Sequence, residues 1–408
     1  MKYVIIGNSA AGAGAVEGIR QVDKNGEITV ITNEAHHTYS RPLISYLLMG
    51  KASEDKMKYR PDSFYKDNNC NLLYGTVTKI DAETKQAALA DGSRVPYDRL
   101  LVATGSSAFI PPFEGLDALE DKFIFMGLDD ARKLDAALCP DKRVLIVGAG
   151  LIGLKCAEGI LNRAQRITVI DLAPGILSSI LDDDGAKYVQ SHLESKGIEF
   201  ILSRSISRLE ENTAVLDGGE TVGFDILILA VGVRPNTSLL NGIAGIDRGI
   251  VINERSETSA PGIYAAGDCT QSTDISSGLS RPMALLPNAY IQGECAGINM
   301  AVGDKTFDKA IPMNAAGFCG LHVITAGNYT GDVYAENKDG SYKRLFYKSN
   351  ALNGYILIGN VEKAGIYTSL IRERTALDTI DFELVCRKPS LMAFTKEDRI
   401  IKLGSEST

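Results

Sequence analysis

The sequence predicts an α/β fold built from a duplicated unit of parallel strands and helices, followed by a smaller α+β domain. Two pairs of similar segments indicate the duplication. "MKYVIIGNSAAGAGAVEGIR" opens the chain with an apolar strand, a glycine turn and a helix-like stretch, and "RVLIVGAGLIGLKCAEGI" at 143–160 repeats that order. "YDRLLVATGSSAFIPP" at 97–112 and "FDILILAVGVRPN" at 224–236 form the second pair. Because both pairs occur in the same order, duplication explains them better than chance.

Each strand–turn–helix has the pattern of a phosphate-binding turn. The first glycine permits a tight backbone, the second lets a pyrophosphate approach, and the third allows the helix to pack closely on the strand. The helix N-terminus then faces the phosphates. The first turn departs from this pattern, because a serine replaces the middle glycine. The residues assigned to the two turns are Gly7, Ser9, Ala10, Ala11 and Gly12, and Gly148, Gly150, Leu151, Ile152 and Gly153.

An acidic residue follows each turn at the end of the next apolar strand. "EITVITNE" ends at Glu34, and "RITVID" ends at Asp171. Such an acid accepts hydrogen bonds from ribose hydroxyls. Two turns, each with its acid, therefore predict two dinucleotide sites on two Rossmann-like domains.

A third motif is "TSAPGIYAAGDCTQ" at 258–271. A strand over 263–266 delivers Gly267 and Asp268 at its carboxyl end, where the carboxylate can reach a polyol chain lying across the sheet. The alternative is that Asp268 only caps the next turn.

Composition excludes several classes of protein. The chain has 45% hydrophobic and 23% charged residues and a net charge of −8, unlike a general nucleic-acid binder. It has no run of 18 apolar residues, so no membrane span is expected. The N-terminus enters a strand directly, without a signal segment, and the cytoplasm is the default location. Seven cysteines without a Cys-x-x-Cys pair predict no disulfide framework, and no metal site is expected.

The pattern changes after about residue 311. "HVITAGNY", "KRLFYKS" and "GYILIGN" are typical of antiparallel strands joined by Gly/Asn turns, and a helix is predicted from about 364 to 374. The tail "KLGSEST" is expected to be loose. Three domains are expected. The first is discontinuous and consists of 1–112 and 243–311, the second spans 113–242, and the third, the α+β domain, spans 312–408.

These motifs together resemble the pyridine nucleotide–disulfide oxidoreductase superfamily over the whole length. The resemblance implies FAD on the first turn and NAD(P)H on the second. It implies that Glu34 binds the adenosine ribose, Asp268 the ribityl chain, and that a helix from near Asn288 points its positive end at the flavin. Asp171 would repel a 2′-phosphate, and "DLAPGIL" offers no nearby arginine, so NADH is favoured. The remaining implied cofactor-binding residues are Arg41, Pro42, Ala103, Thr104, Gly105, Gly232, Pro287 and Ala289.

Disulfide reductases of this superfamily carry cysteine on the helix after the second strand, but residues 34–52 contain none. The sequence is therefore similar to the branch of NADH:rubredoxin and ferredoxin reductases and the flavin part of NADH-dependent nitrite reductases. That branch implies hydride transfer from NADH to the flavin, then single electrons to an iron–sulfur or rubredoxin-type protein or subunit. An NADH oxidase and a non-catalytic flavin-binding subunit are the alternatives. The C-terminal domain is expected to mediate a homo-oligomer or a complex.

Two positions depart from the ferredoxin reductases. Ser45 takes the place of a lysine that many of them have beside flavin N5, and Lys155 replaces the usual glutamate two residues after the third glycine. The positive charge beside flavin N5 would then come from Lys155 in the second dinucleotide-binding domain instead of from a lysine at position 45 in the first. Lys155 and Ser45 are therefore the candidate catalytic residues. The alternative is that Lys155 faces solvent. His36 and His37 are expected in a polar loop near the FAD.

Overall fold

The computed structural model describes residues 1–338 and 340–402. The chain forms two compact units. The first consists of Met1–Leu177, Glu194–Ser272 and Ser280–Asp308. The second consists of Ser178–Leu193, Thr273–Leu279 and the chain from Lys309 onward. Of the tail "KLGSEST", residues 403–408 lie outside the described residues.

The first unit contains two parallel five-stranded sheets of matching design. The first sheet has the order β19-β7-β1-β2-β3 and the second β12-β11-β10-β16-β9, so the strand that leads into each phosphate-binding turn is central in its sheet. We call these two turns, at 7–12 and 148–153, the fingerprint turns, and the strand before and the helix after each of them the fingerprint strand and helix. Both surfaces of the central strands are covered, which explains their unbroken apolar sequences. The first sheet comprises β1 (Lys2–Ile6), β2 (Glu27–Thr32), β3 (Cys70–Tyr74), β7 (Arg99–Val102) and β19 (Ile263–Ala265); the second comprises β9 (Lys122–Ile124), β10 (Arg143–Val147), β11 (Arg166–Asp171), β12 (Ile198–Leu202) and β16 (Ile226–Leu229).

The duplication extends to an antiparallel meander inserted before the fourth strand of each repeat. The first meander is β4 (Val77–Asp81), β5 (Gln86–Leu89) and β6 (Arg94–Pro96); the second is β13 (Ile206–Glu210), β14 (Thr213–Leu216) and β15 (Thr221–Gly223). The predicted α/β class with two Rossmann-like domains is thus confirmed. We call the sheet around β1 with its helices the first nucleotide domain, and the sheet around β10 with its helices the second.

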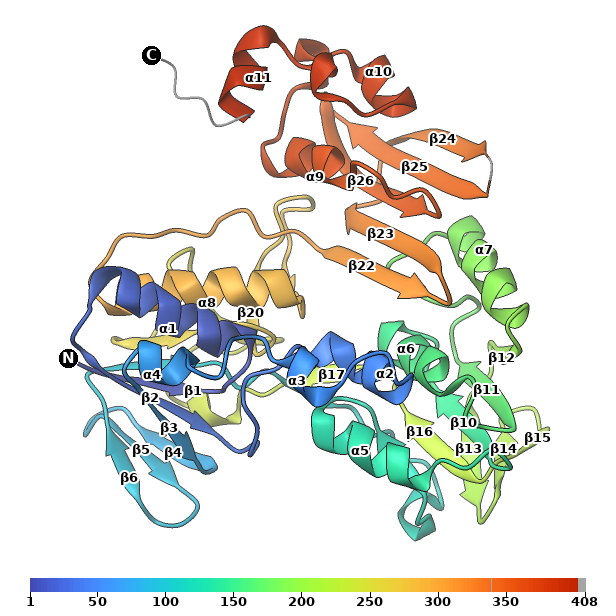
Figure 1. Ribbon diagram of the computed structural model, residues 1–408, viewed down its shortest axis with the longest axis horizontal. Helices are drawn as coiled ribbons and strands as arrows, with labels where there is room; N and C mark the ends of the chain where they lie inside the picture. Colours follow the sequence, from blue (N-terminus) through green and yellow to red (C-terminus); the bar gives the residue numbers. More distant parts are fainter. Residues whose placement is uncertain (339, 403–408) are drawn as a thin grey trace. The chain divides into compact units, whose positions relative to one another are not determined.

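Helices cover these sheets (Figure 1). α1 (Ala10–Val22), α4 (Phe64–Asp67) and α8 (Leu286–Met300) contact the first sheet. We count α2 (Ile44–Leu48) and α3 (Glu54–Met57), which lie between β2 and β3 in the chain, with the first nucleotide domain, although α2 itself contacts α5 and α6. The second has α5 (Leu128–Ala137) and α6 (Leu151–Ile160). In the described part of the chain, no helix is both long and apolar enough to cross a membrane.

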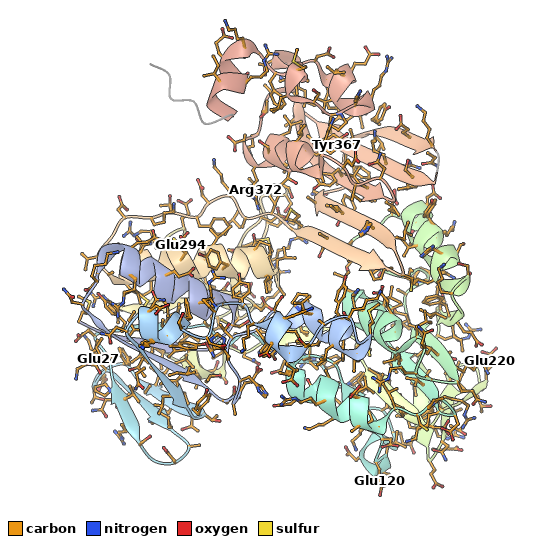
Figure 2. The ribbon with its side chains drawn as sticks, viewed as in Figure 1. Glu27, Glu120, Glu220, Glu294, Tyr367 and Arg372 are labelled. Atoms are coloured by element: carbon orange, nitrogen blue, oxygen red, sulfur yellow. The ribbon has the colours of Figure 1, made fainter. Side chains whose placement is uncertain are left out.

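Helices α1 and α8 lie side by side because glycines remove the side chains between them (Figure 1). A Cβ on Gly293 would lie 2.0 Å from the Ala11 carbonyl oxygen, and one on Gly297 would lie 2.2 Å from that of Ala15. At the far end Gln21 donates to Glu294, which Figure 2 labels on α8, at 2.8 Å. This close approach fixes α8 against the fingerprint helix.

The second unit contains an antiparallel sheet of order β22-β23-β26-β25-β24. Tyr355 of this sheet and Tyr367 of α9 are buried, with ring centroids 5.5 Å apart. α9 ends earlier than predicted, because Arg374 has a φ of +48° that a helix does not allow. The elements are β22 (Met313–Phe318), β23 (Leu321–Gly327), β24 (Asp332–Lys338), β25 (Ser341–Lys348), β26 (Ala351–Ile358), α7 (Asp183–Glu194), α9 (Ala364–Arg372), α10 (Phe382–Arg387) and α11 (Lys396–Lys402).

Segment Ser178–Leu193, which contains most of α7, packs within the second unit, although it falls inside the expected nucleotide-binding range 113–242. Tyr342 of β25 contacts both carboxylate oxygens of Asp182 at 2.7 Å, and Tyr188 donates to the Gly340 carbonyl at 2.6 Å. The three domain ranges remain predictions.

The helix contact generates a stability prediction. Gly297→Ala should destabilise the first unit by about 1–3 kcal/mol, because the new methyl group must push α8 away from the α1 backbone. Gly365→Ala is the matched control, because a Cβ there would meet no described atom within 4 Å. It should be neutral or stabilise α9 by up to about 1 kcal/mol. Denaturant unfolding followed by circular dichroism measures both, and equal stability of the two variants would contradict the prediction.

Candidate functional site

The two fingerprint turns have the same backbone geometry. Gly7 has a φ of +122°, and a Cβ there would lie 2.1 Å from the Ala103 carbonyl oxygen. Gly148 has a φ of +114°, and a Cβ there would lie 2.3 Å from the Ala230 carbonyl oxygen. Glycine is therefore required at both positions, by conformation and by space. In each case the fourth strand of the repeat ends against the turn.

The third glycine of each turn brings the helix onto its own loop. A Cβ on Gly12 would lie 2.2 Å from the Gly7 carbonyl oxygen, and one on Gly153 would lie 1.9 Å from that of Gly148. α1 and α6 therefore start directly above the turns. The structure brings together all the residues predicted for each turn.

The N-termini of α1 and α6 fit phosphate groups. They begin after Ser9 and Gly150. Within the described residues the Ser9 side chain accepts no hydrogen bond from its helix, and Gly150 has no side chain to do so. A Cβ on Gly150 would meet no described atom within 4 Å, so this side of the turn is open. Uncapped N–H groups at a helix N-terminus attract anions. Both turns therefore fit the pyrophosphate of a dinucleotide.

The Gly-Asp motif lies between α1 and α8. Gly267 has a φ of +81°, and a Cβ there would lie 3.3 Å from the Ala11 Cβ and 3.4 Å from the Ala289 Cβ. Gln292 of α8 holds the motif, because its Oε1 accepts from the Gly267 N–H at 2.9 Å. Three predicted elements, the first turn, Gly267–Asp268 and the start of α8 at Pro287–Asn288, thus meet at one edge of the sheet.

Asp268 is half-buried in this edge. Burial raises the pKa of its carboxyl group, while the charge of Arg41 and a hydrogen bond from Ser106 act in the opposite direction. Burial opposes the charged form of Arg41 as well, but Tyr39, Glu34 and Asp268 raise the pKa of its guanidinium above the usual value. Arg41 therefore stays cationic beside two of the acids predicted to contact FAD.

Glu34 and Arg41 form an ion pair, with 2.5 Å between Oε1 and Nη2. The Tyr39 hydroxyl donates to the other Glu34 oxygen at 3.0 Å and accepts from the Leu128 N–H of α5 at 3.0 Å. Burial raises the pKa of Tyr39 to about 12, so the hydroxyl keeps its proton. Glu34, the residue predicted to bind the adenosine ribose, is thus linked through the Tyr39 hydroxyl to α5 of the second nucleotide domain.

The two Ala-x-Gly segments pair with each other. β8 (Ser106–Ala108) and β17 (Val233–Pro235) form an antiparallel ribbon between the nucleotide domains. The Thr104 hydroxyl donates to the Asn236 carbonyl at 2.7 Å, and the Asn236 amide donates back to the Thr104 carbonyl at 3.0 Å. The Thr104 side chain, predicted to bind cofactor, thus has a structural partner. Gly105 and Gly232 have positive φ and no described atom within 4 Å of a Cβ position.

Asp171 supports the second turn. Its carboxylate accepts from the Ala149 N–H at 2.6 Å and from the Ala173 N–H at 2.7 Å. The backbone N–H of Arg204 donates to the Asp171 backbone carbonyl at 3.1 Å. The Arg204 side chain instead lies near Glu220 (labelled in Figure 2), with 3.5 Å between Nε and Oε2. The only arginine bonded to Asp171 among the described residues is therefore engaged by another acid.

The two candidate catalytic residues lie in the same helix contact but differ in exposure and partners. Ser45 is 1% exposed, and its hydroxyl donates to the Pro42 carbonyl at 3.3 Å. Its neighbour Tyr46 faces Lys155, whose Nζ lies 4.7 Å from the ring centroid. Lys155 is 17% exposed and forms an ion pair with Glu158, so the solvent-facing alternative for Lys155 does not hold.

His36 and His37 lie in a polar loop. His36 lies 2.8 Å from Asp129 of α5, and the His37 ring meets Tyr65 edge-on. The Tyr65 hydroxyl donates to the Asn8 side chain in the first turn at 2.7 Å. The loop thus supports the turn.

The cysteines are free thiols. Burial raises the pKa of Cys269 to about 11 and also raises that of Cys156 and Cys295. These groups stay protonated near neutral pH, which makes them poor nucleophiles.

Sequence reasoning missed several partners of the predicted residues. Glu158 could have been found, because it lies one helical turn after Lys155 and opposite charges at that spacing pair on a helix. Gln292 could not have been found this way, because its side chain bonds Gly267, which lies 25 residues earlier in the sequence. Tyr46 and Asn8 carry no local signal, since their contacts with Lys155 and Tyr65 join segments far apart in the sequence. Tyr39 bonds nearby Glu34 as well as distant Leu128.

Comparison with known proteins agrees with this geometry. The family described as "Pyridine nucleotide-disulphide oxidoreductase" matches residues 1–293. The chain is 33% identical over 392 residues to "NADH-dependent phenylglyoxylate dehydrogenase subunit epsilon" of Aromatoleum evansii, covering 92% of each chain. It is 31% identical over 389 residues to "Nitrite reductase [NAD(P)H]" of Bacillus subtilis strain 168, covering 91% of this chain but only 47% of that relative.

Among solved structures, the covalent putidaredoxin reductase–putidaredoxin complex matches with a TM-score of 0.88 and 21% identity, covering 99% of both chains. That likeness concerns the fold alone. The family match and the 33% identical relative together assign the sequence. The chain belongs to the pyridine nucleotide-disulphide oxidoreductase family.

Proposed function

We propose that the protein is an FAD-dependent NADH:acceptor oxidoreductase whose electrons pass singly to an iron–sulfur or rubredoxin-type protein or subunit. The observation that carries the proposal is the pair of glycine turns, each followed by a helix with an uncapped N-terminus, within one compact unit. Bound FAD would accept hydride from NADH and release electrons one at a time, which is chemistry that the cofactor supplies. We expect this in the cytoplasm, since the seven cysteines are free thiols.

The residues of the chain would bind and orient the two cofactors. The N-terminus of α1 would bind the FAD pyrophosphate, Glu34 the adenosine ribose and Asp268 the ribityl chain. The N-terminus of α6 and Asp171 would bind NADH. Positioning is the main requirement, since hydride transfer between two stacked rings needs no general base.

Relatives support a partner protein. The 33% identical relative is named as a subunit, and the chain spans about half of the nitrite reductase it matches. We therefore propose that the acceptor is a separate protein or subunit that carries an iron centre. We propose that the C-terminal domain mediates this complex or a homo-oligomer.

The function is tested by anaerobic titration. NADH should bleach the bound flavin rapidly, and a rubredoxin or a [2Fe–2S] ferredoxin should then restore its colour. Rapid steady NADH oxidation in air by the protein alone would instead identify an oxidase. Bleaching over many minutes would favour a non-catalytic flavin-binding subunit.

Cofactor choice gives a second prediction. The unmodified protein should prefer NADH over NADPH in kcat/KM, because the Asp171 carboxylate repels a 2′-phosphate. Asp171→Ala should narrow that preference about tenfold, equivalent to about 1.4 kcal/mol. Glu211→Ala, an exposed acid in the same domain, is the matched control and should leave the ratio unchanged. Equal kcat/KM values for the two cofactors in the unmodified protein would refute the assignment.

Flavin binding gives a third prediction. Asp268→Ala should lower FAD content several-fold, because the ribityl hydroxyls lose a charged acceptor. NAD⁺-dependent thermal stabilisation should persist, since the second nucleotide domain is untouched. Glu83→Ala, an exposed acid in the first meander, should keep full FAD content. Undiminished FAD in Asp268→Ala would show that Asp268 only supports its turn.

A fourth prediction concerns the electron count. Since burial keeps the Cys269 and Cys295 thiols protonated, they should not exchange electrons with the flavin. Anaerobic reduction should consume two electrons per FAD, and Cys269→Ser or Cys295→Ser should keep NADH-to-dye transfer within a few-fold. Four electrons per FAD, or a thiolate–flavin charge-transfer band, would restore a disulfide mechanism.

A further inference from the structure

A buried ion pair lies where the first nucleotide domain packs on the second. Lys155 and Glu158 pair along α6, with side chains 17% and 7% exposed. Among the buried residues of the described chain, Glu158 and Asp274 are the only carboxylates. An apolar pair of similar volume would fill such a place at a lower desolvation cost. Packing alone therefore does not explain the two charges.

Tyr46 holds the same ammonium group from the other domain. Its ring centroid lies 4.7 Å from Lys155 Nζ, within the range of a cation–π contact. The two helices touch beside it, because a Cβ on Gly159 would lie only 3.2 Å from the Ser45 carbonyl oxygen. The ammonium is thus fixed between a carboxylate on α6 and an aromatic ring on α2.

Both helices continue from segments that fit a cofactor. α6 begins directly after Gly150, where the second turn is open. α2 follows the short 3-10 turn Arg41–Leu43, whose Arg41 pairs with Glu34 and interacts with Asp268. Two dinucleotides held at these segments can react only where the domains meet. The contact of α2 with α6 is one such place, and the Lys155–Glu158 ion pair lies in it.

We propose that Lys155 is the fixed positive charge beside the reacting ends of the two cofactors, with Tyr46 and Glu158 as its positioning residues; this rests on the function proposed above. A fixed positive charge favours the more negative, reduced form of the flavin and so raises its reduction potential. Tyr46 and Glu158 act through Lys155, because they hold its ammonium group in place.

The test measures the two-electron midpoint potential of bound FAD by dye equilibration, together with the rate of flavin reduction by NADH. Lys155→Met should shift the reduction equilibrium about tenfold toward oxidised flavin, which is about −30 mV for a two-electron couple. Reduction by NADH should slow about tenfold or more, with FAD content unchanged. Lys133→Met, an exposed lysine on α5, is the matched control and should leave both quantities unchanged.

A second pair of variants tests the positioning role and replaces the first if Lys155→Met does not fold. Tyr46→Leu should lower the potential in the same direction, while Tyr46→Phe, which keeps the ring, should retain it. A potential for Lys155→Met equal to that of Lys133→Met, or equal potentials for Tyr46→Leu and Tyr46→Phe, would overturn the inference. Dye equilibration does not need NADH, so failure of NADH to bleach the unmodified protein would refute the proposed function separately.

Discussion

The close contact between a glycine and the end of a neighbouring strand determines the rest of the structure. Gly7 abuts the Ala103 carbonyl, and Gly148 abuts the Ala230 carbonyl, at distances that leave no space for a Cβ. Each contact fixes where the following helix starts and therefore where its uncapped N–H groups point. The helix packing of α8 on α1 repeats the same constraint with Gly293. The phosphate-binding turns and the packing of α8 on α1 thus depend on the same kind of contact, in which a glycine lets two backbone segments touch directly.

Much of the fold could be predicted, because its determinants are local. The buried parallel strands are continuous apolar runs, and both turns show their glycines in sequence. β24 could not be predicted this way, because it is an edge strand whose mostly exposed residues lack apolar alternation. The inserted meanders were also missed, since short half-exposed strands such as β6 and β15 give weak patterns.

The positions of the candidate site were predictable where one residue type has one geometric role, as at Gly12 and Gly153. They were less predictable where a side chain has a partner far away in sequence. Thr104 stays a predicted cofactor contact, but its hydroxyl bond to Asn236, 132 residues later, could not be predicted. Tyr46 was overlooked beside Ser45, because only the packing of α2 on α6 makes its ring a neighbour of Lys155.

The ribbon of β8 and β17 joins the two repeats through equivalent segments. The polar groups of each segment therefore find their hydrogen-bond partners in the other repeat. Thr104 and Asn236 exchange two hydrogen bonds, and Ser107 adds a third at 2.8 Å to the Asn236 side chain. A change in one segment leaves a polar group unpaired in the other. Substitutions at these positions should therefore covary through evolution. A chimera that exchanges one nucleotide domain for a relative's would need to inherit the matching segment as well.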